Sequence, residues 1–348
     1  MAGVARPHAC LLLPPAFVCL MLGLVGGLSR MGLVQPPLQQ IAQNHGPLMV
    51  VGFLAALIAA ERALTLNNVL MAVASTHFSF GGLLLMFPLE ILNAVLWLGG
   101  GIAFLLWSFW TLVRFRKNFS TIFFVAAGFL LLAGNIFFIL NYPSTYYVFA
   151  WTTFFTAFIV GERMDMLKIT NASQPSYLMA AASIPLAFIG LASINKYFFA
   201  AVFILLLISV ASHDVALSFL RRGGFSRYLS LGLFTAYFWL AVSAVLWLLS
   251  SSTDVMLHSV FLGFVGTMVF THAPIILPAL LKTSHFYSPL LYIPFALLQL
   301  STAIRLVSAQ TLQIGLWSLS GVLTVVSVVV FIALGPGSTF VRKGLQAG

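Results

Sequence analysis

The residues of this chain that could carry chemistry are its histidines, of which there are seven among 348 residues. His45 and His258 each stand at the start of a long apolar run, and His272 lies within the same run as His258. An imidazole in an apolar membrane segment is costly, so we expect each to have a polar, water or metal partner. Because few other polar side chains are available, a haem or metal site is the leading hypothesis.

The composition that surrounds these histidines is that of a membrane protein. The chain is 61% hydrophobic and 6% charged, whereas about a quarter of the residues in a soluble domain are charged. Apolar runs of about twenty residues predict an all-α bundle of about twelve transmembrane helices, which makes the lipid bilayer a partner. We expect one integral membrane domain, 1–348, with a short cytoplasmic tail, 335–348. The predicted spans are 10–29, 46–66, 69–88, 90–113, 119–140, 144–161, 177–195, 198–219, 228–249, 256–280, 287–307 and 311–334.

The basic residues predict the orientation of these spans. Of the sixteen Lys and Arg residues, all but Arg30, Lys196 and Arg305 fall at the termini or in the even-numbered connections. The positive-inside rule then places both termini in the cytoplasm. Since the basic residues lie between apolar runs and form no patch, the net charge of +10 does not indicate a nucleic-acid partner.

His45 and His258 are predicted to lie at a similar depth in the membrane. The second and tenth spans run in the same direction, so the residues that open them lie near the same face. Two axial histidines on different helices at one depth are what a six-coordinate haem requires. The alternative is that both histidines merely flank their spans. Met49, about one turn after His45, is a further candidate ligand, although packing is the commoner role of methionine.

A second set of candidate ligands lies deeper in the tenth span. About 21 Å of helical rise separates His258 from His272, so the two cannot ligate a single ion. Met268 lies one turn before His272, and a thioether beside an imidazole suits copper. His77, inside the third span, is either a core histidine with a hydrogen-bond partner or a third ligand.

Two prolines, Pro274 and Pro278, follow His272 within the same span. A proline in a helix removes one hydrogen bond and frees a carbonyl one turn back, here near Phe270 and Pro274. Irregular backbone at membrane depth is tolerated where protein or a watery cavity covers it. We therefore expect a kink, which serves either function or packing.

The second and sixth predicted spans both end in a glutamate–arginine pair, Glu61-Arg62 and Glu162-Arg163. On one interpretation, each pair is an interfacial ion pair by itself. On the other, the two pairs belong to one polar cluster with two more residues near the end of the eighth span. Those residues are His213 and Asp214.

Two stretches of the chain resemble the NnrS family of haem- and copper-containing bacterial membrane proteins. The first is similar to the family's Leu-His-x4-Gly-x2-Gly-Thr-Met run and consists of Leu257, His258, Gly263, Gly266, Thr267 and Met268. The second is similar to the family's histidine segment and consists of His45, Met49 and Gly52. The expected twelve-helix layout also fits this family.

The resemblance implies a haem- or metal-binding role for His45 and His258. It also implies a redox or sensing function in the response to nitric oxide and nitrosative stress, with a respiratory or electron-transfer partner. The chain departs from the family pattern at Asn44 and at Gly46-Pro47, because the family tends to show His-Glu after a first histidine. The haem expectation therefore rests on more residues than the nitric-oxide expectation.

Two other classes of function compete with haem binding. A twelve-helix transporter is one, because transporters use helices broken by Pro or Gly with polar residues near the midplane. The chain lacks the glycine–aspartate–arginine signature of major facilitator proteins, however. An accessory or assembly subunit of a respiratory complex is the other. No carboxylate pair, nucleophile triad or phosphate loop is evident, so the sequence leaves open whether the protein is an enzyme.

Overall fold

The structure is a computed structural model that describes residues 9–115, 118–166, 174–211, 213–214, 219–250, 252–281, 283 and 286–337. Within these ranges the protein is all-helical and has no β-strand, which confirms the predicted all-α class. Nine of the described helices are long and apolar enough to cross a membrane. Two shorter apolar helices, α5 (Val69–Leu84) and α10 (Lys196–Ala211), accompany them.

Every predicted span coincides with a helical segment of the structure, although some ends differ. Of the span predicted at 198–219, the described helix α10 covers the residues up to Ala211, and the next described residues, 213–214, are not helical. Residues Ala333–Gly337 form a short turn with a kink at Gly335, and 338–348 lie outside the described residues, so the tail at 335–348 stays a prediction. His8 and His285 also lie outside them.

The other elements are α1 (Ala9–Arg30), α2 (Gln39–Gln43), α3 (His45–Pro47), η1 (Leu48–Ala55), α4 (Ala56–Thr65), α6 (Glu90–Arg114), α7 (Ser120–Ile139), α8 (Ser144–Met166), α9 (Gln174–Ser193), α11 (Gly224–Leu249), α12 (Thr253–His258), η3 (Ser259–Gly266), α13 (Thr267–Leu281), η4 (Pro289–Leu291), α14 (Tyr292–Thr311), α15 (Ile314–Ile332) and η5 (Ala333–Gly337).

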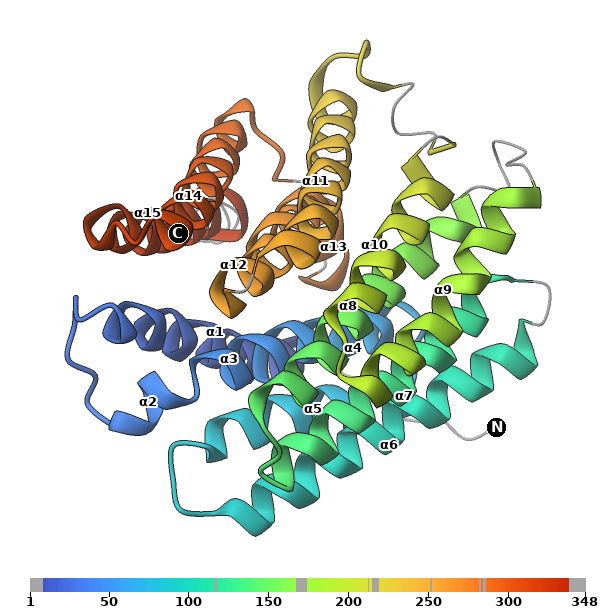
Figure 1. Cartoon of the computed structure of the whole chain (residues 1–348), viewed down its shortest axis with the longest axis horizontal. Coiled ribbons are helices and arrows are strands. Elements are labelled where there is room, and N and C mark those ends of the chain that lie inside the picture. The colour runs from blue at the N-terminus through green and yellow to red at the C-terminus, as the bar shows by residue number, and fades with distance from the viewer. Residues whose placement is uncertain are drawn as a thin grey trace, which may run out of the picture.

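Neighbouring helices pack in three successive groups (Figure 1). The first group contains α5, α6, α7 and α8, and the second contains α9, α10, α11 and the continuous α12–η3–α13 segment. The third joins the two ends of the chain, because α14 packs on α15, α15 on α1, and α1 on the α3–η1–α4 segment. One segment of each group lies at the centre. There, α4 of the third group contacts α13 of the second, and α8 of the first group contacts η3 of the second. The centre of the bundle is therefore built from α4, α8 and α13.

Two of the three central segments contain the same irregularity. In each, eight residues of π-helix follow a histidine: η1 lies just beyond His45, and η3 begins directly after His258. A π-helix is rare and occurs mostly where function or strain demands it. The third central helix, α8, is regular and is buried at every position from 149 to 158. The two predicted haem-ligating histidines thus lie just before the two stretches of π-helix.

Small residues let α1, η1 and α5 approach closely beneath these histidines. The side chain of Cys19 is fully buried, and its thiol donates a hydrogen bond to the backbone carbonyl of Ser79. A Cβ atom added at Gly82 would lie 2.9 Å from the Cα of Gly52 and 3.0 Å from the Sγ of Cys19. Only glycine fits at this contact, since backbone cannot move aside as a flexible side chain can.

We expect Gly82→Ala to destabilise the protein by about 1–3 kcal/mol, the usual cost of overpacking a core. The variant should melt at a lower temperature than the parent protein when both are unfolded in the same detergent. Gly315→Ala is the matched control, because a Cβ atom there meets nothing within 4 Å. Identical melting temperatures for Gly82→Ala and the parent protein would contradict the close contact.

Candidate functional site

His45 is held against the glycine-rich face of α1. Its Nδ1 lies 2.6 Å from the carbonyl oxygen of Gly23. A Cβ atom added at Gly27 would lie 3.0 Å from Cε1 of the ring, and one at Gly26 would lie 3.4 Å from Cβ of His45. Because a carbonyl oxygen can only accept, Nδ1 carries the proton and donates it. Among the described residues, Nε2 of His45 has no hydrogen-bond partner.

His258 is oriented in the same way from α12. Its Nδ1 lies 2.9 Å from the backbone carbonyl oxygen of Asp254 and 3.2 Å from the carboxylate of the same residue. That carboxylate also accepts from Arg305 at 2.5 and 2.9 Å, and the guanidinium of Arg305 lies over the ring of Trp317 at 4.6 Å. Within the described part of the chain, Nε2 of His258 likewise makes no hydrogen bond.

The two histidines lie at the same end of the bundle. His45 is close enough to His258, and to Arg30 and Arg305, for their charges to interact. Histidines that ligate a metal or haem usually donate from one ring nitrogen to a carbonyl or carboxylate, which fixes the other nitrogen toward the iron or metal. Both rings donate from Nδ1 in this way. Two imidazoles that keep Nε2 without a partner among the described residues are donors that suit haem iron.

Met49 lies against the same turn of α1 that holds His45. A Cβ atom added at Gly23 would come within 2.5 Å of the Met49 Sδ, so the thioether is in contact with that glycine. This contact is the packing role that methionine commonly has.

His77 does not join the other histidines. Its ring lies between α5 and α6, where a Cβ atom at Gly99 would lie 3.0 Å from Cδ2 and one at Gly100 would lie 3.1 Å from its Cβ. Its Nδ1 is buried without a hydrogen-bond partner in the part of the chain that the structure describes. The described residues as a whole also contain no group of three His, Cys, Asp or Glu side chains arranged to hold a metal.

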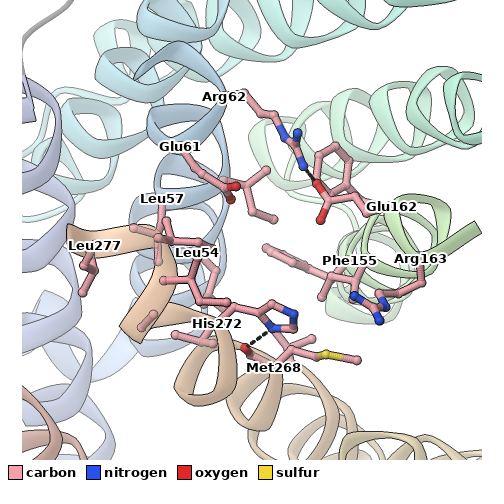
Figure 2. Close-up of a pocket in the computed structure, with 18 of the residues that line it drawn as sticks. Leu54, Leu57, Glu61, Arg62, Phe155, Glu162, Arg163, Met268, His272 and Leu277 are labelled. Carbon is pink, nitrogen blue, oxygen red and sulfur yellow. Dashed lines mark hydrogen bonds and ion pairs between the residues drawn. The ribbon is translucent and has the colours of Figure 1, made fainter. Parts of the chain in front are cut away.

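His272 and Met268 lie far along the segment from His258. The Nδ1 of His272 donates to the backbone carbonyl of Met268 at 2.9 Å, and both side chains line a large cavity (Figure 2). The structure thus separates His272 from the His45–His258 pair, as the helical rise predicts. Both candidate copper ligands face one space, but they are on successive turns of one helix.

The prolines that follow His272 do not end the helix, because α13 continues to Leu281. The carbonyl oxygen of Phe270, which Pro274 deprives of its donor, accepts a hydrogen bond of 3.0 Å from the buried hydroxyl of Tyr228 on α11. The carbonyl oxygen of Pro278 accepts from the backbone N–H of Thr283. Packing between α11 and α13 therefore satisfies the carbonyl that the sequence predicts to be free at Phe270.

The cavity has a volume of about 550 Å³ and lies between the three central helices. Its walls come from α4, α8 and α13, with further residues from α1, α6, α7 and α15, and it reaches exposed Leu66 and Phe115 at one end of the bundle. We call this the Arg62 end, since Arg62 lines the cavity there. Most lining residues are apolar, and many are aromatic. Nothing in the sequence periodicity indicates this space, because it forms between helices from different groups.

Ion pairs join the central helices beside the cavity. Arg62 of α4 forms an ion pair with Glu162 of α8, as Figure 2 shows. Arg163 binds both carboxylate oxygens of Asp214, at 2.8 and 2.9 Å, and the hydroxyl of Tyr237 donates to the same carboxylate. Arg62, Glu162, Arg163 and Asp214 therefore form two ion pairs side by side, whereas no ion pair includes Glu61 among the described residues. His213 lies nearby, with its Nδ1 3.4 Å from the Ser176 hydroxyl.

Comparison with known proteins gives one match. A family model described as "Domain of unknown function (DUF8744)" covers residues 9–338, which is nearly the whole chain. No curated protein matches the chain, and no solved structure matches it.

Proposed function

The chain belongs to the DUF8744 family, and we propose that it is a haem-binding protein of a bacterial inner membrane with a redox or sensing role. The observation that carries the proposal is that the rings of His45 and His258 are held by the same kind of hydrogen bond. Each ring donates from Nδ1 to a backbone carbonyl and keeps an Nε2 without a partner among the described residues. The resemblance of both segments to the NnrS family supports the same cofactor.

The residues at this site have separable tasks. The carbonyl oxygens of Gly23 and Asp254 hold the two imidazoles in the tautomer that leaves Nε2 available for iron. Arg30 would supply positive charge for a propionate at the polar surface, whereas the guanidinium of Arg305 is bound to Asp254. A bound haem would supply a one-electron couple. If both imidazoles bound the iron, the haem would supply electron transfer with a redox partner rather than turnover of a ligand.

The proposal includes an orientation of the chain in the membrane. Nine described helices have the length and composition of membrane spans, and the remaining predicted spans are α5, α8 and α10. With twelve spans and the positive-inside rule, the Arg62 end and both termini face the cytoplasm, and His45 and His258 face the other side. A role in the response to nitric oxide is part of the proposal only through the NnrS resemblance.

Copper is the second cofactor in the proposal. Its candidate ligands are the Nε2 of His272 and the thioether of Met268, which line the same cavity. Imidazole and thioether groups suit copper(I). Copper content is therefore a necessary measurement alongside iron.

We expect the purified full-length protein to show a Soret band and sharp α and β bands in a reduced-minus-oxidised spectrum. Iron should approach one atom per chain, and copper measured on the same sample tests the second site. A colourless, iron-free protein that remains monodisperse and melts cooperatively after expression with added haem precursor would overturn the haem proposal.

A further inference from the structure

The cavity at the Arg62 end is a site that the proposed haem does not use. The haem ligands His45 and His258 do not line it, whereas Glu61 and His272 do. Its volume of about 550 Å³ falls in the range of cavities that hold drug-sized ligands. Glu61, Glu162 and His272 extend from three different helices toward the same space (Figure 2).

Acidic residues gather at this end of a protein that is otherwise strongly basic. The chain has only six Asp and Glu residues against sixteen Lys and Arg. Four of the six lie beside the cavity or in its ion-pair cluster, and three of these have a partner: Glu162 pairs with Arg62, Asp214 with Arg163, and Asp165 accepts from Ser120 at 2.5 Å. The fourth is Glu61.

The carboxylate of Glu61 makes no hydrogen bond or salt bridge with any described residue, and it faces the cavity. The neighbouring guanidinium of Arg62 is directed to Glu162. A carboxylate without a partner in apolar surroundings is costly, so it either takes up a proton or binds a cation. Glu61 is therefore the anionic group available to a ligand in this space.

His272 adds a second acceptor. Its Nδ1 carries the proton that is donated to the Met268 carbonyl, so in the copper-free protein Nε2 keeps a lone pair that is free to accept, and copper at His272 would compete with the ligand. An ammonium group supplies several N–H donors, which suits two acceptors on different helices. The aromatic rings of Phe155 and Phe158 line the space beside them and can interact with a cation as well as with an apolar body.

From this arrangement we propose that the cavity binds a hydrophobic organic ammonium ion, with Glu61 as counter-ion and His272 as hydrogen-bond acceptor. The apolar body of the ligand would occupy the wall between α4, α8 and α13. One feature favours a negatively charged ligand instead, because the Nε of Arg62 is buried and has no acceptor among the described residues. An anionic amphiphile is thus the competing occupant, and the test must separate the two.

The test uses two fluorescent probes that share a dansyl group and a chain of similar length. Dansylcadaverine ends in an ammonium group, and dansyl-6-aminohexanoate ends in a carboxylate. With full-length protein in neutral-lipid nanodiscs, we expect saturable fluorescence enhancement with the cation and at least tenfold weaker binding of the anion. Tighter binding of the anionic probe, or equal binding of both, would overturn the proposal.

Variants assign the binding to the cavity. Glu61→Gln should weaken dansylcadaverine binding at least tenfold, and Glu61→Asp should restore part of it. Glu90→Gln is the matched control, because Glu90 is exposed at the opposite end of the bundle and should leave binding unchanged. His272→Ala should weaken binding while leaving the iron content of the protein unaltered, so this result is independent of the haem proposal. If Glu61→Gln and Glu90→Gln, both folded by melting temperature, bind the cation equally, Glu61 is not the counter-ion.

Discussion

Replacing His45 or His258 by alanine is expected to remove at least nine-tenths of the haem from the purified protein. Each substitution takes away one of the two proposed axial ligands, and the remaining histidine would hold a haem only in a five-coordinate and weaker state. The measurement is the Soret absorbance and iron content per chain of His45→Ala and His258→Ala, purified beside the parent protein. Melting temperature shows that each variant is folded.

His77→Ala is the matched control for this prediction. It removes an imidazole of the same size from between α5 and α6, where the ring contacts Gly99 and Gly100, away from the two proposed ligands. Haem content should stay at the parental value. A conservative variant, His258→Met, should retain a six-coordinate haem with a higher midpoint potential, since a methionine ligand raises the potential of haem iron. Full haem occupancy in both alanine variants would exclude the pair as ligands.

Replacing Asp214 by alanine is expected to cost about 3–5 kcal/mol of stability, the range for a buried ion pair that loses one partner. The side chain of Asp214 is 1% exposed, and that of Arg163 is 17% exposed. The substitution leaves the guanidinium without its two-oxygen partner and removes the acceptor of the Tyr237 hydroxyl. Unfolding of Asp214→Ala in mixed micelles of increasing denaturing-detergent fraction measures the loss.

The double variant Arg163→Met with Asp214→Leu separates the cost of an unpaired charge from the value of the pair. Replacing a buried ion pair by apolar residues of similar size is often neutral or stabilising, so the double variant should be more stable than Asp214→Ala. Glu90→Ala, at an exposed acid, should change stability by less than about 0.5 kcal/mol. If the double variant were as unstable as Asp214→Ala, a buried unpaired charge would not be the cause.

Two of the three basic residues on the minority side of the charge count, Arg305 and Lys196, have structural explanations. Arg305 is 6% exposed because it binds Asp254, and the Nζ of Lys196 donates to the backbone carbonyl of Ser250 at 2.7 Å. Charge counting treats every Lys and Arg as facing the membrane surface. For these two residues, a specific partner within the protein determines the position instead.

The helical class and the approximate positions of the apolar helices follow from the sequence, because a run of about twenty apolar residues specifies a helix through local hydrophobicity alone. The alternating direction of the spans also placed His45 and His258 at one end, where the structure finds them within electrostatic range. The free carbonyl at Phe270 followed from the chemistry of a single residue, Pro274. Each of these inferences depends on residues that are neighbours in the chain.

The tertiary structure decided which side chains meet. The sequence left open whether the two glutamate–arginine pairs were separate, and only the packing shows that Arg62 pairs with Glu162 and that Tyr228 supplies the donor for Phe270. It left His77 open as a third ligand, and the packing of α5 on α6 holds that ring away from the other histidines. The cavity beside Glu61 exists only because α4, α8 and α13 come from three groups that meet at the centre. Partner choice depends on how helix surfaces fit together over long sequence separations, which hydrophobic periodicity does not encode.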